Sequence, residues 1–109
     1  MVYELEALTA PRLSALIDAG VSTVVVPFGS IEHQGGHLAI GADSLLADAI
    51  GREVASRLGA VLAPTVRVGC AEQHMQRIGT MTLQARTLTE VAIELAGSLA
   101  AQGLSLIHI

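Results

Sequence analysis

Two polar, glycine-containing segments hold the side chains whose types could carry out chemistry. The first segment covers residues 29–42. With the residue that follows, it supplies two carboxylates and two imidazoles: Glu32, His33, His37 and Asp43. Carboxylate oxygens together with imidazole nitrogens suit Zn²⁺, Mn²⁺ or iron, whereas Ca²⁺ prefers oxygen ligands alone. We therefore predict a metal site formed by these four side chains.

Each of these residues also has an ordinary structural interpretation. His33 and His37 are four residues apart, as in helical zinc motifs, but Gly35 and Gly36 between them disfavour a helix. Both histidines could be solvated surface residues. Asp43 could be only the N-cap of the helix that follows it. The residues alone leave both interpretations open.

The second polar segment, residues 67–86, contains Cys70, Glu72 and His74. Cys70 and His74 could act as a nucleophile and its base. However, no evident third group would orient the imidazole, and a lone cysteine is more often a small buried apolar residue. Glu72 and His74 are the candidate catalytic residues of this segment.

Three helices that would position these segments are expected from apolar periodicity, start signals and glycine stops. Thr9 would cap the first helix, the second would run from near Asp43 to Gly59, and Thr87 with Glu90 would form a capping box on the third. The apolar faces are expected to comprise Leu13, Leu16 and Ile17 in the first helix, Leu45, Leu46, Ile50, Val54 and Leu58 in the second, and Leu88, Val91, Leu95 and Leu99 in the third.

Strands are expected at residues 22–28, 60–64 and 104–109, between these helices. The first contains three consecutive valines without alternation, as in a strand that is buried on both faces. Alternating strands and helices predict an α/β fold with a mainly parallel sheet. Both polar segments follow strands, and ligands of open parallel sheets bind beyond the carboxyl ends of the strands. The last apolar strand has no helix to cover it, so residues 1–109 are expected to form a single partial domain, truncated at its C-terminus.

The composition excludes several classes of function. Aromatic residues make up 2% of the chain and the net charge is −4, which argues against a nucleic-acid partner. No stretch approaches the roughly 18 apolar residues that would span a membrane, and no signal peptide is recognisable at the first residues. One cysteine excludes a disulfide within the chain, so a reducing, cytoplasmic setting is expected.

The segment around Glu32 resembles the opening of the creatininase (creatinine amidohydrolase) family. The similarity is carried by residues 24–32, 35–38 and 41–43, and in the second segment by residues 69–75 and 79–83. The resemblance implies an α/β/α fold and a homo-oligomer. It also implies a site with two divalent metal ions, zinc or manganese with iron as a further option, that hydrolyses amides or other C–N bonds of small molecules.

The resemblance also implies roles for individual residues. It makes Glu32 a metal ligand and Asp43 the ligand that bridges the two ions. The family has a histidine where this chain has Gln34, so either His33 or His37 supplies the nitrogen or one metal site is weakened. The family's remaining ligands follow the strand that begins near residue 104, beyond the end of this chain.

The expected function is therefore that of a metal-dependent amidohydrolase in the full-length protein, with a small-molecule substrate and an inactive N-terminal fragment. Gln34 motivates an alternative, a catalytically impaired binding protein on the same fold.

Overall fold

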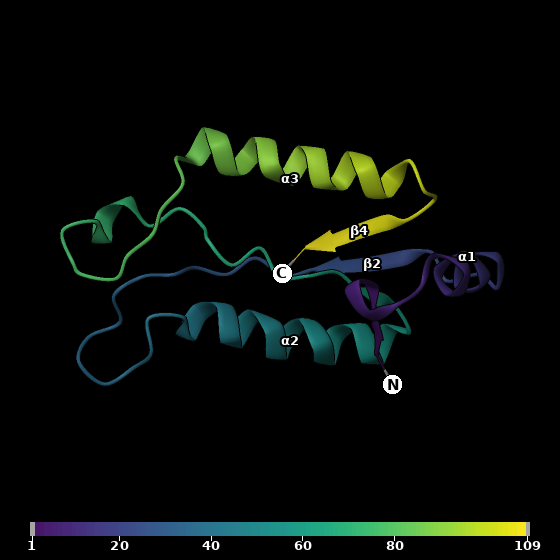
Figure 1. Cartoon of the computed structure of the whole chain (residues 1–109), viewed down its shortest axis with the longest axis horizontal. Coiled ribbons are helices and arrows are strands. Elements are labelled where there is room, and N and C mark those ends of the chain that lie inside the picture. The colour runs from purple at the N-terminus through teal and green to yellow at the C-terminus, as the bar shows by residue number, and fades with distance from the viewer. Residues whose placement is uncertain (1, 109) are drawn as a thin grey trace.

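The computed structural model describes residues 2–108, which contain four strands and three α-helices (Figure 1). The strands are β1 (Tyr3–Glu4), β2 (Thr23–Val26), β3 (Val61–Leu62) and β4 (Ser105–His108). The helices are α1 (Ala10–Asp18), α2 (Ala42–Leu58) and α3 (Ala85–Ala100), with 3-10 turns η1 (Leu5–Ala7) and η2 (Glu72–His74).

All pairings in the sheet are parallel, in the order β1-β3-β2-β4. The central strand β2 pairs with β3 through Val24 and Val61, and with β4 through Val24 and Leu106. The expected α/β fold with a mainly parallel sheet is thereby confirmed. Strand β1 was not predicted, because two residues are too short to produce a periodic pattern. Ile109, the last residue of the predicted final strand, lies outside the described residues.

Helices cover both faces of the sheet. Alternate valines of β2 point to opposite faces, so each face has its own apolar cluster. Val24 and Val26 belong to the cluster that includes Leu99 of α3 and, at its edge, Leu13 of α1. Val25 belongs to a second cluster with residues of α2 and β3. In Figure 1, α2 runs along one side of the sheet and α3 along the other, which confirms the three-layer arrangement.

The face that α2 turns toward the sheet differs from the predicted one. Its buried residues are small: Ser44, Ala47, Gly51 and Ala55. A Cβ atom at Gly51 would lie 2.5 Å from Cγ of Pro27, so only a glycine allows the helix to approach this closely. Most of the predicted apolar stripe instead faces outward, with exposed fractions of 56% for Leu45, 59% for Leu46 and 43% for Ile50, whereas Val54 packs against the cluster around Val25. The prediction is wrong for the outward-facing residues because close packing selects side-chain size before hydrophobicity.

Helix boundaries follow the predicted signals at α1 and α2 but not at α3. The Thr9 side chain accepts a hydrogen bond from the Arg12 backbone N–H (3.3 Å), and Gly59 ends α2 with φ +64°. Helix α3 begins two residues before Thr87, with Gln84 as its N-cap, so the predicted capping box is wrong.

Helix α3 leaves part of the sheet uncovered. A groove of about 520 Å³ separates its side chains from β2 and β4, and residues from both walls line it, among them Val26, Phe28, Leu88, Ala92, Leu95 and Leu106. None of the helices within residues 2–108 has the length and apolar content needed to cross a membrane.

Candidate functional site

Two long loops leave the carboxyl ends of neighbouring strands and run side by side. The first loop (residues 27–41) follows β2 and the second loop (residues 63–84) follows β3. Backbone hydrogen bonds join the loops at Gly29 N to Val66 O (2.8 Å), Met81 N to Ile31 O (2.8 Å) and Leu83 N to Gly69 O (2.9 Å). Figure 1 shows both loops at the end of the molecule away from α1. The predicted location of the polar segments at the strand ends is therefore confirmed.

The buried hydroxyl of Ser44 fixes both loops to the first turn of α2. Ser44 has no exposed surface, and its Oγ lies 3.0 Å from the carbonyl oxygen of Ser30 and 2.7 Å from that of Arg67. Close approach requires glycine here, because a Cβ at Gly29 would lie 2.3 Å from Ser44 Oγ. A Cβ at Gly69 would lie 2.6 Å from the Gly29 carbonyl oxygen. Small residues thus let the start of α2 and both loops pack closely together in one corner of the molecule, formed around Gly29, Ser44 and Gly69.

A second contact between α2 and the second loop is electrostatic. Asp48 accepts hydrogen bonds from the Thr65 hydroxyl and from the Arg67 guanidinium, the latter at 3.0 Å. The Thr65 hydrogen bond and then the Arg67 charge lower the pKa of Asp48 below its ordinary value. Because Asp48 lies one turn after Ser44, both contacts hold the start of the second loop against the same helix.

Two carboxylates accept hydrogen bonds from the same side-chain amide at this corner. The side-chain Nε2 of Gln34 donates to Glu32 Oε1 at 3.3 Å and to Asp43 Oδ2 at 2.8 Å. The Ser30 hydroxyl donates to the other oxygen of Glu32 at 2.9 Å. Asp43 stands in the first turn of α2, whose N-cap is Gly41, so the N-cap interpretation of Asp43 is wrong.

One imidazole approaches this pair from the second loop. Nε2 of His74 lies 3.9 Å from Glu32 Oε1, and the His74 side chain is 35% exposed. Glu72 and Cys70 are exposed. Glu72 and His74 belong to one 3-10 turn, in which residues two apart point in different directions. The structure therefore brings His74, and not Glu72, toward the carboxylates.

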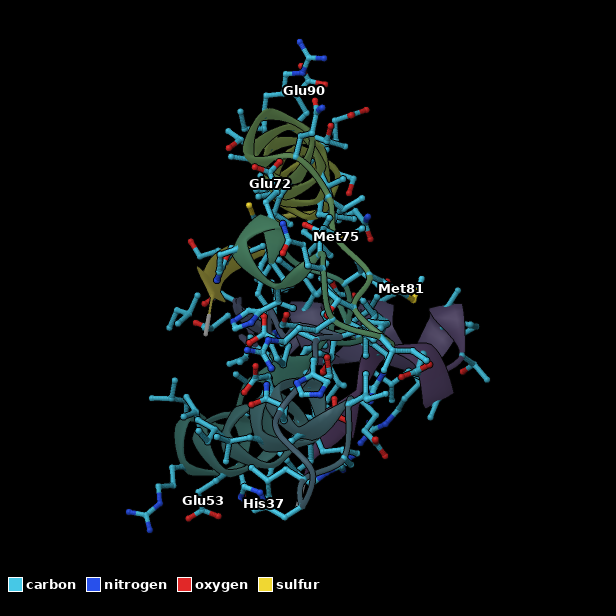
Figure 2. The ribbon with its side chains drawn as sticks, turned by 90° about the vertical axis from the view of Figure 1, so that its left-hand side faces the viewer. His37, Glu53, Glu72, Met75, Met81 and Glu90 are labelled. Atoms are coloured by element: carbon cyan, nitrogen blue, oxygen red, sulfur yellow. The ribbon has the colours of Figure 1, made fainter. Side chains whose placement is uncertain are left out.

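The two histidines of the first loop have other surroundings. His33 is held by its backbone N–H, which donates to Thr80 Oγ1 at 3.1 Å, while its Nδ1 accepts from the Gly35 N–H at 3.2 Å. His37 is exposed. Figure 2 shows His37 on the α2 side of the molecule and Glu72 on the α3 side, so these two do not share one site.

The donor types at this corner suit a divalent cation, but their arrangement is incomplete. Glu32 and Asp43 offer carboxylate oxygens and His74 offers a nitrogen, ligands that Zn²⁺ and Mn²⁺ accept. Among residues 2–108, however, no three histidine, cysteine, aspartate or glutamate side chains gather closely enough to hold an ion as they stand. The Gln34 amide occupies the space between the two carboxylates, so a cation shared by both would have to displace it.

The predicted site residues omitted three that organise this corner: Gln34, Ser30 and Ser44. Gln34 had a signal, because it stands where the resembled family has a histidine. Ser30 and Ser44 had none, because a serine is ordinary in a glycine-containing loop and in a first helical turn.

Known proteins resemble this chain in sequence and in structure. Residues 6–109 match the family described as creatininase, creatinine amidohydrolase. The mycofactocin precursor peptide peptidase of Mycobacterium ulcerans is 31% identical over 108 residues, covering 82% of this chain and 43% of that protein. The creatinine amidohydrolase of Pseudomonas putida is 31% identical over 101 residues, covering 88% of this chain and 39% of that protein.

Solved creatininase structures have the same fold. A manganese creatininase superimposes with a TM-score of 0.91 at 28% identity, covering 99% of this chain and 44% of that one. A mutant creatininase of the Zn-Zn type superimposes with a TM-score of 0.89 at 27% identity and the same coverage. The chain thus spans less than half the length of the relatives that it matches. With its sequence match over residues 6–109 and its shared fold, this chain belongs to the creatininase family.

Proposed function

We propose that the protein is a metal-dependent hydrolase of an amide or related C–N bond in a small molecule, and that this chain carries the N-terminal part of its active site. One observation above all supports the proposal: Glu32 and Asp43 converge at the carboxyl end of the sheet, bound to one amide nitrogen. Neighbouring creatininase structures contain manganese or zinc, which favours a divalent ion. Because the chain spans less than half the length of these relatives, the proposal also includes site residues from outside it.

The residues of this chain have separate tasks in the proposed site. Glu32 and Asp43 bind the cation through their carboxylates, and Ser30 orients Glu32 through its second oxygen. His74 lies at the edge of the pair, where it can contact a substrate or exchange a proton. When bound, a divalent ion polarises the amide carbonyl and lowers the pKa of a water nucleophile toward about 7. His33 and His37 could bind the cation only after a rearrangement of the first loop.

The two named relatives suggest which substrates to test. One is a creatinine amidohydrolase and the other a peptidase of a precursor peptide, so both are named for cleaving C–N bonds. The substrate panel should therefore contain creatinine, other small cyclic amides and short peptides. We propose a small amide as the first candidate, and a homo-oligomer as the assembly of the complete protein.

The experiment is to assay the complete protein on this panel after chelation and after addition of Mn²⁺ or Zn²⁺. We expect hydrolysis that requires the metal and falls at least about 100-fold in Asp43→Asn, because a neutral amide binds cations far more weakly than a carboxylate. Glu53→Gln is the matched control, because Glu53 is an exposed residue of the same helix, away from the loops. Metal-independent hydrolysis, or equal rates in Asp43→Asn and the unaltered protein, would exclude the proposal.

A second candidate function is that of a binding protein that has lost catalysis on the same fold. The hydrogen bonds from Gln34 favour it, because they hold the two carboxylates together without any metal. Turnover of the substrate panel distinguishes the two functions. Metal-dependent turnover of any substrate excludes the function of a binding protein without catalysis, whereas binding of a small amide without turnover supports that function.

A further inference from the structure

The position of Gln34 relative to the two carboxylates suggests more than a missing ligand. A side-chain amide carries two N–H hydrogens, so one nitrogen can donate to two acceptors at the same time. Nε2 of Gln34 does so, at 2.8 Å from Asp43 Oδ2 and 3.3 Å from Glu32 Oε1. A hydrogen bond to a carboxylate is stronger than one between neutral groups. The amide therefore binds the same two groups that a bridging cation would bind.

The conformation of the first loop directs this side chain, and no neighbouring one, to the carboxylates. Gly35 has φ +76°, a value that favours glycine, and turns the chain immediately after Gln34. The backbone of His33 is anchored to Thr80 across the loops, and its imidazole caps the Gly35 N–H. The turn thus leaves Gln34 as the residue of this loop tip that reaches both Glu32 and Asp43.

Charge explains why the carboxylates need such a partner. The Glu32 side chain is only 16% exposed, so water screens its charge incompletely. Two nearby carboxylates repel each other unless a cation or hydrogen-bond donors stabilise them. The Ser30 hydroxyl donates a hydrogen bond to one oxygen of Glu32, and no lysine or arginine among residues 2–108 forms an ion pair with either carboxylate. Gln34 is the donor that the two acidic groups share.

We propose that the Gln34 amide is a built-in substitute for a cation, which holds Glu32 and Asp43 in place without metal and competes with a divalent ion for both. Metal binding then requires the amide to rotate away from the pair. Two consequences follow: the metal-free corner is already ordered, and its affinity for a divalent ion is lower than the two carboxylates alone would give. The inference rests on the proposed metal site, but it concerns binding and is independent of hydrolysis.

The test compares metal binding by the unaltered protein, Gln34→Ala and the control Gln76→Ala, using equilibrium dialysis against Zn²⁺ or Mn²⁺ and elemental analysis. Gln76 is an exposed glutamine of the second loop. We expect Gln34→Ala to bind the ion at least about tenfold more tightly, the equivalent of one hydrogen bond to a charged group. Gln76→Ala should match the unaltered protein. Equal or weaker binding by Gln34→Ala, including no binding by either protein, would overturn the proposal.

A second measurement on the unaltered protein avoids any dependence on how the variant folds. The side-chain amide protons of Gln34 can be followed by ¹H–¹⁵N NMR during a titration with diamagnetic Zn²⁺. We expect two hydrogen-bonded, slowly exchanging proton signals in the presence of chelator, and a shift to solvent-exposed values as Zn²⁺ binds. Amide signals that stay hydrogen-bonded at saturating Zn²⁺ would overturn the proposal.

The two proposals fail in distinguishable ways. Tighter ion binding by Gln34→Ala without hydrolysis of any substrate would leave the role of Gln34 intact and exclude the hydrolase. Hydrolysis by the unaltered protein together with unchanged ion affinity in Gln34→Ala would support the hydrolase and exclude the proposed role of Gln34.

Discussion

Replacement of Ser44 by alanine tests the corner that joins α2 to both loops. The hydroxyl of this fully buried residue contacts the carbonyl oxygens of Ser30 and Arg67 at 3.0 and 2.7 Å. Within residues 2–108, Ser44 is the only side chain that donates to either carbonyl group, and Ser44→Ala removes it. Leaving a buried polar group without its partner costs about 1–3 kcal/mol.

The helix itself opposes this loss, because alanine has a better helix propensity than serine by up to about 0.5 kcal/mol. Ser56→Ala measures that gain alone, since Ser56 is an exposed residue of α2. The difference between the two variants therefore isolates the buried hydroxyl. We expect Ser44→Ala to be less stable than Ser56→Ala by about 1–3 kcal/mol.

The assay is urea unfolding at neutral pH, with thermal unfolding as a second readout. Each kcal/mol lost should lower the Tm by about 4–8 °C in a domain of this size. Because Ser44 positions both loops, Ser44→Ala should also weaken metal binding at Glu32 and Asp43. If Ser44→Ala is as stable as Ser56→Ala, the hydroxyl does not join the loops to the helix and the reasoning is wrong.

Two further predictions concern the surface of α2. Asp48→Asn should destabilise the protein by less than about 1 kcal/mol at neutral pH, because the partly exposed ion pair is screened by solvent. The pKa of Asp48 is lowered in the folded protein, so its contribution to the free energy of unfolding is present above the unfolded pKa of about 4 and is lost as pH falls through the folded value. Urea unfolding of Asp48→Asn and the unaltered protein from pH 7 downward should therefore show the difference in their stability shrinking below about pH 4. Leu46→Gln combined with Ile50→Gln should reduce self-association without loss of stability, because both side chains are largely exposed. Light scattering during size-exclusion chromatography checks this, with Ser56→Gln as the control, and unchanged association would contradict it.

The sequence predicted the framework of the fold because local signals agree with the tertiary structure there. Three consecutive valines produced a central strand, Thr9 capped α1, and Gly59 ended α2. Each of these signals acts within a few residues of the chain. The parallel sheet followed from the alternating elements, and the α/β/α layers from the family resemblance, whereas the strand order and β1 were not predicted.

Long-range contacts caused the errors in the helices. The inward face of α2 is set by the close approach to Pro27, which only small residues such as Gly51 permit, and the spacing of the large apolar residues does not reveal that approach. Helix α3 begins early because Leu83 is held by the Gly69 carbonyl, which ends the second loop just before Gln84. Both determinants lie far away in the sequence.

The site shows the same division between local and distant information. Glu32 and Asp43 were predicted as partners, and the structure brings them to one amide. The orientation of His33 depends on Thr80, which is 47 positions away. His74 could not be assigned to the pair either, because its distance from Glu32 depends on how the two loops pack.

The central claim is that Glu32 and Asp43 bind a divalent ion at the carboxyl end of the sheet. The most direct measurement is an anomalous diffraction map of crystals of the protein soaked with Mn²⁺. We predict an anomalous peak between the two carboxylates, on the side facing His74, with the Gln34 amide turned away from Asp43. A peak at His37 or elsewhere on the surface, with the Gln34 hydrogen bonds still in place, would contradict the claim.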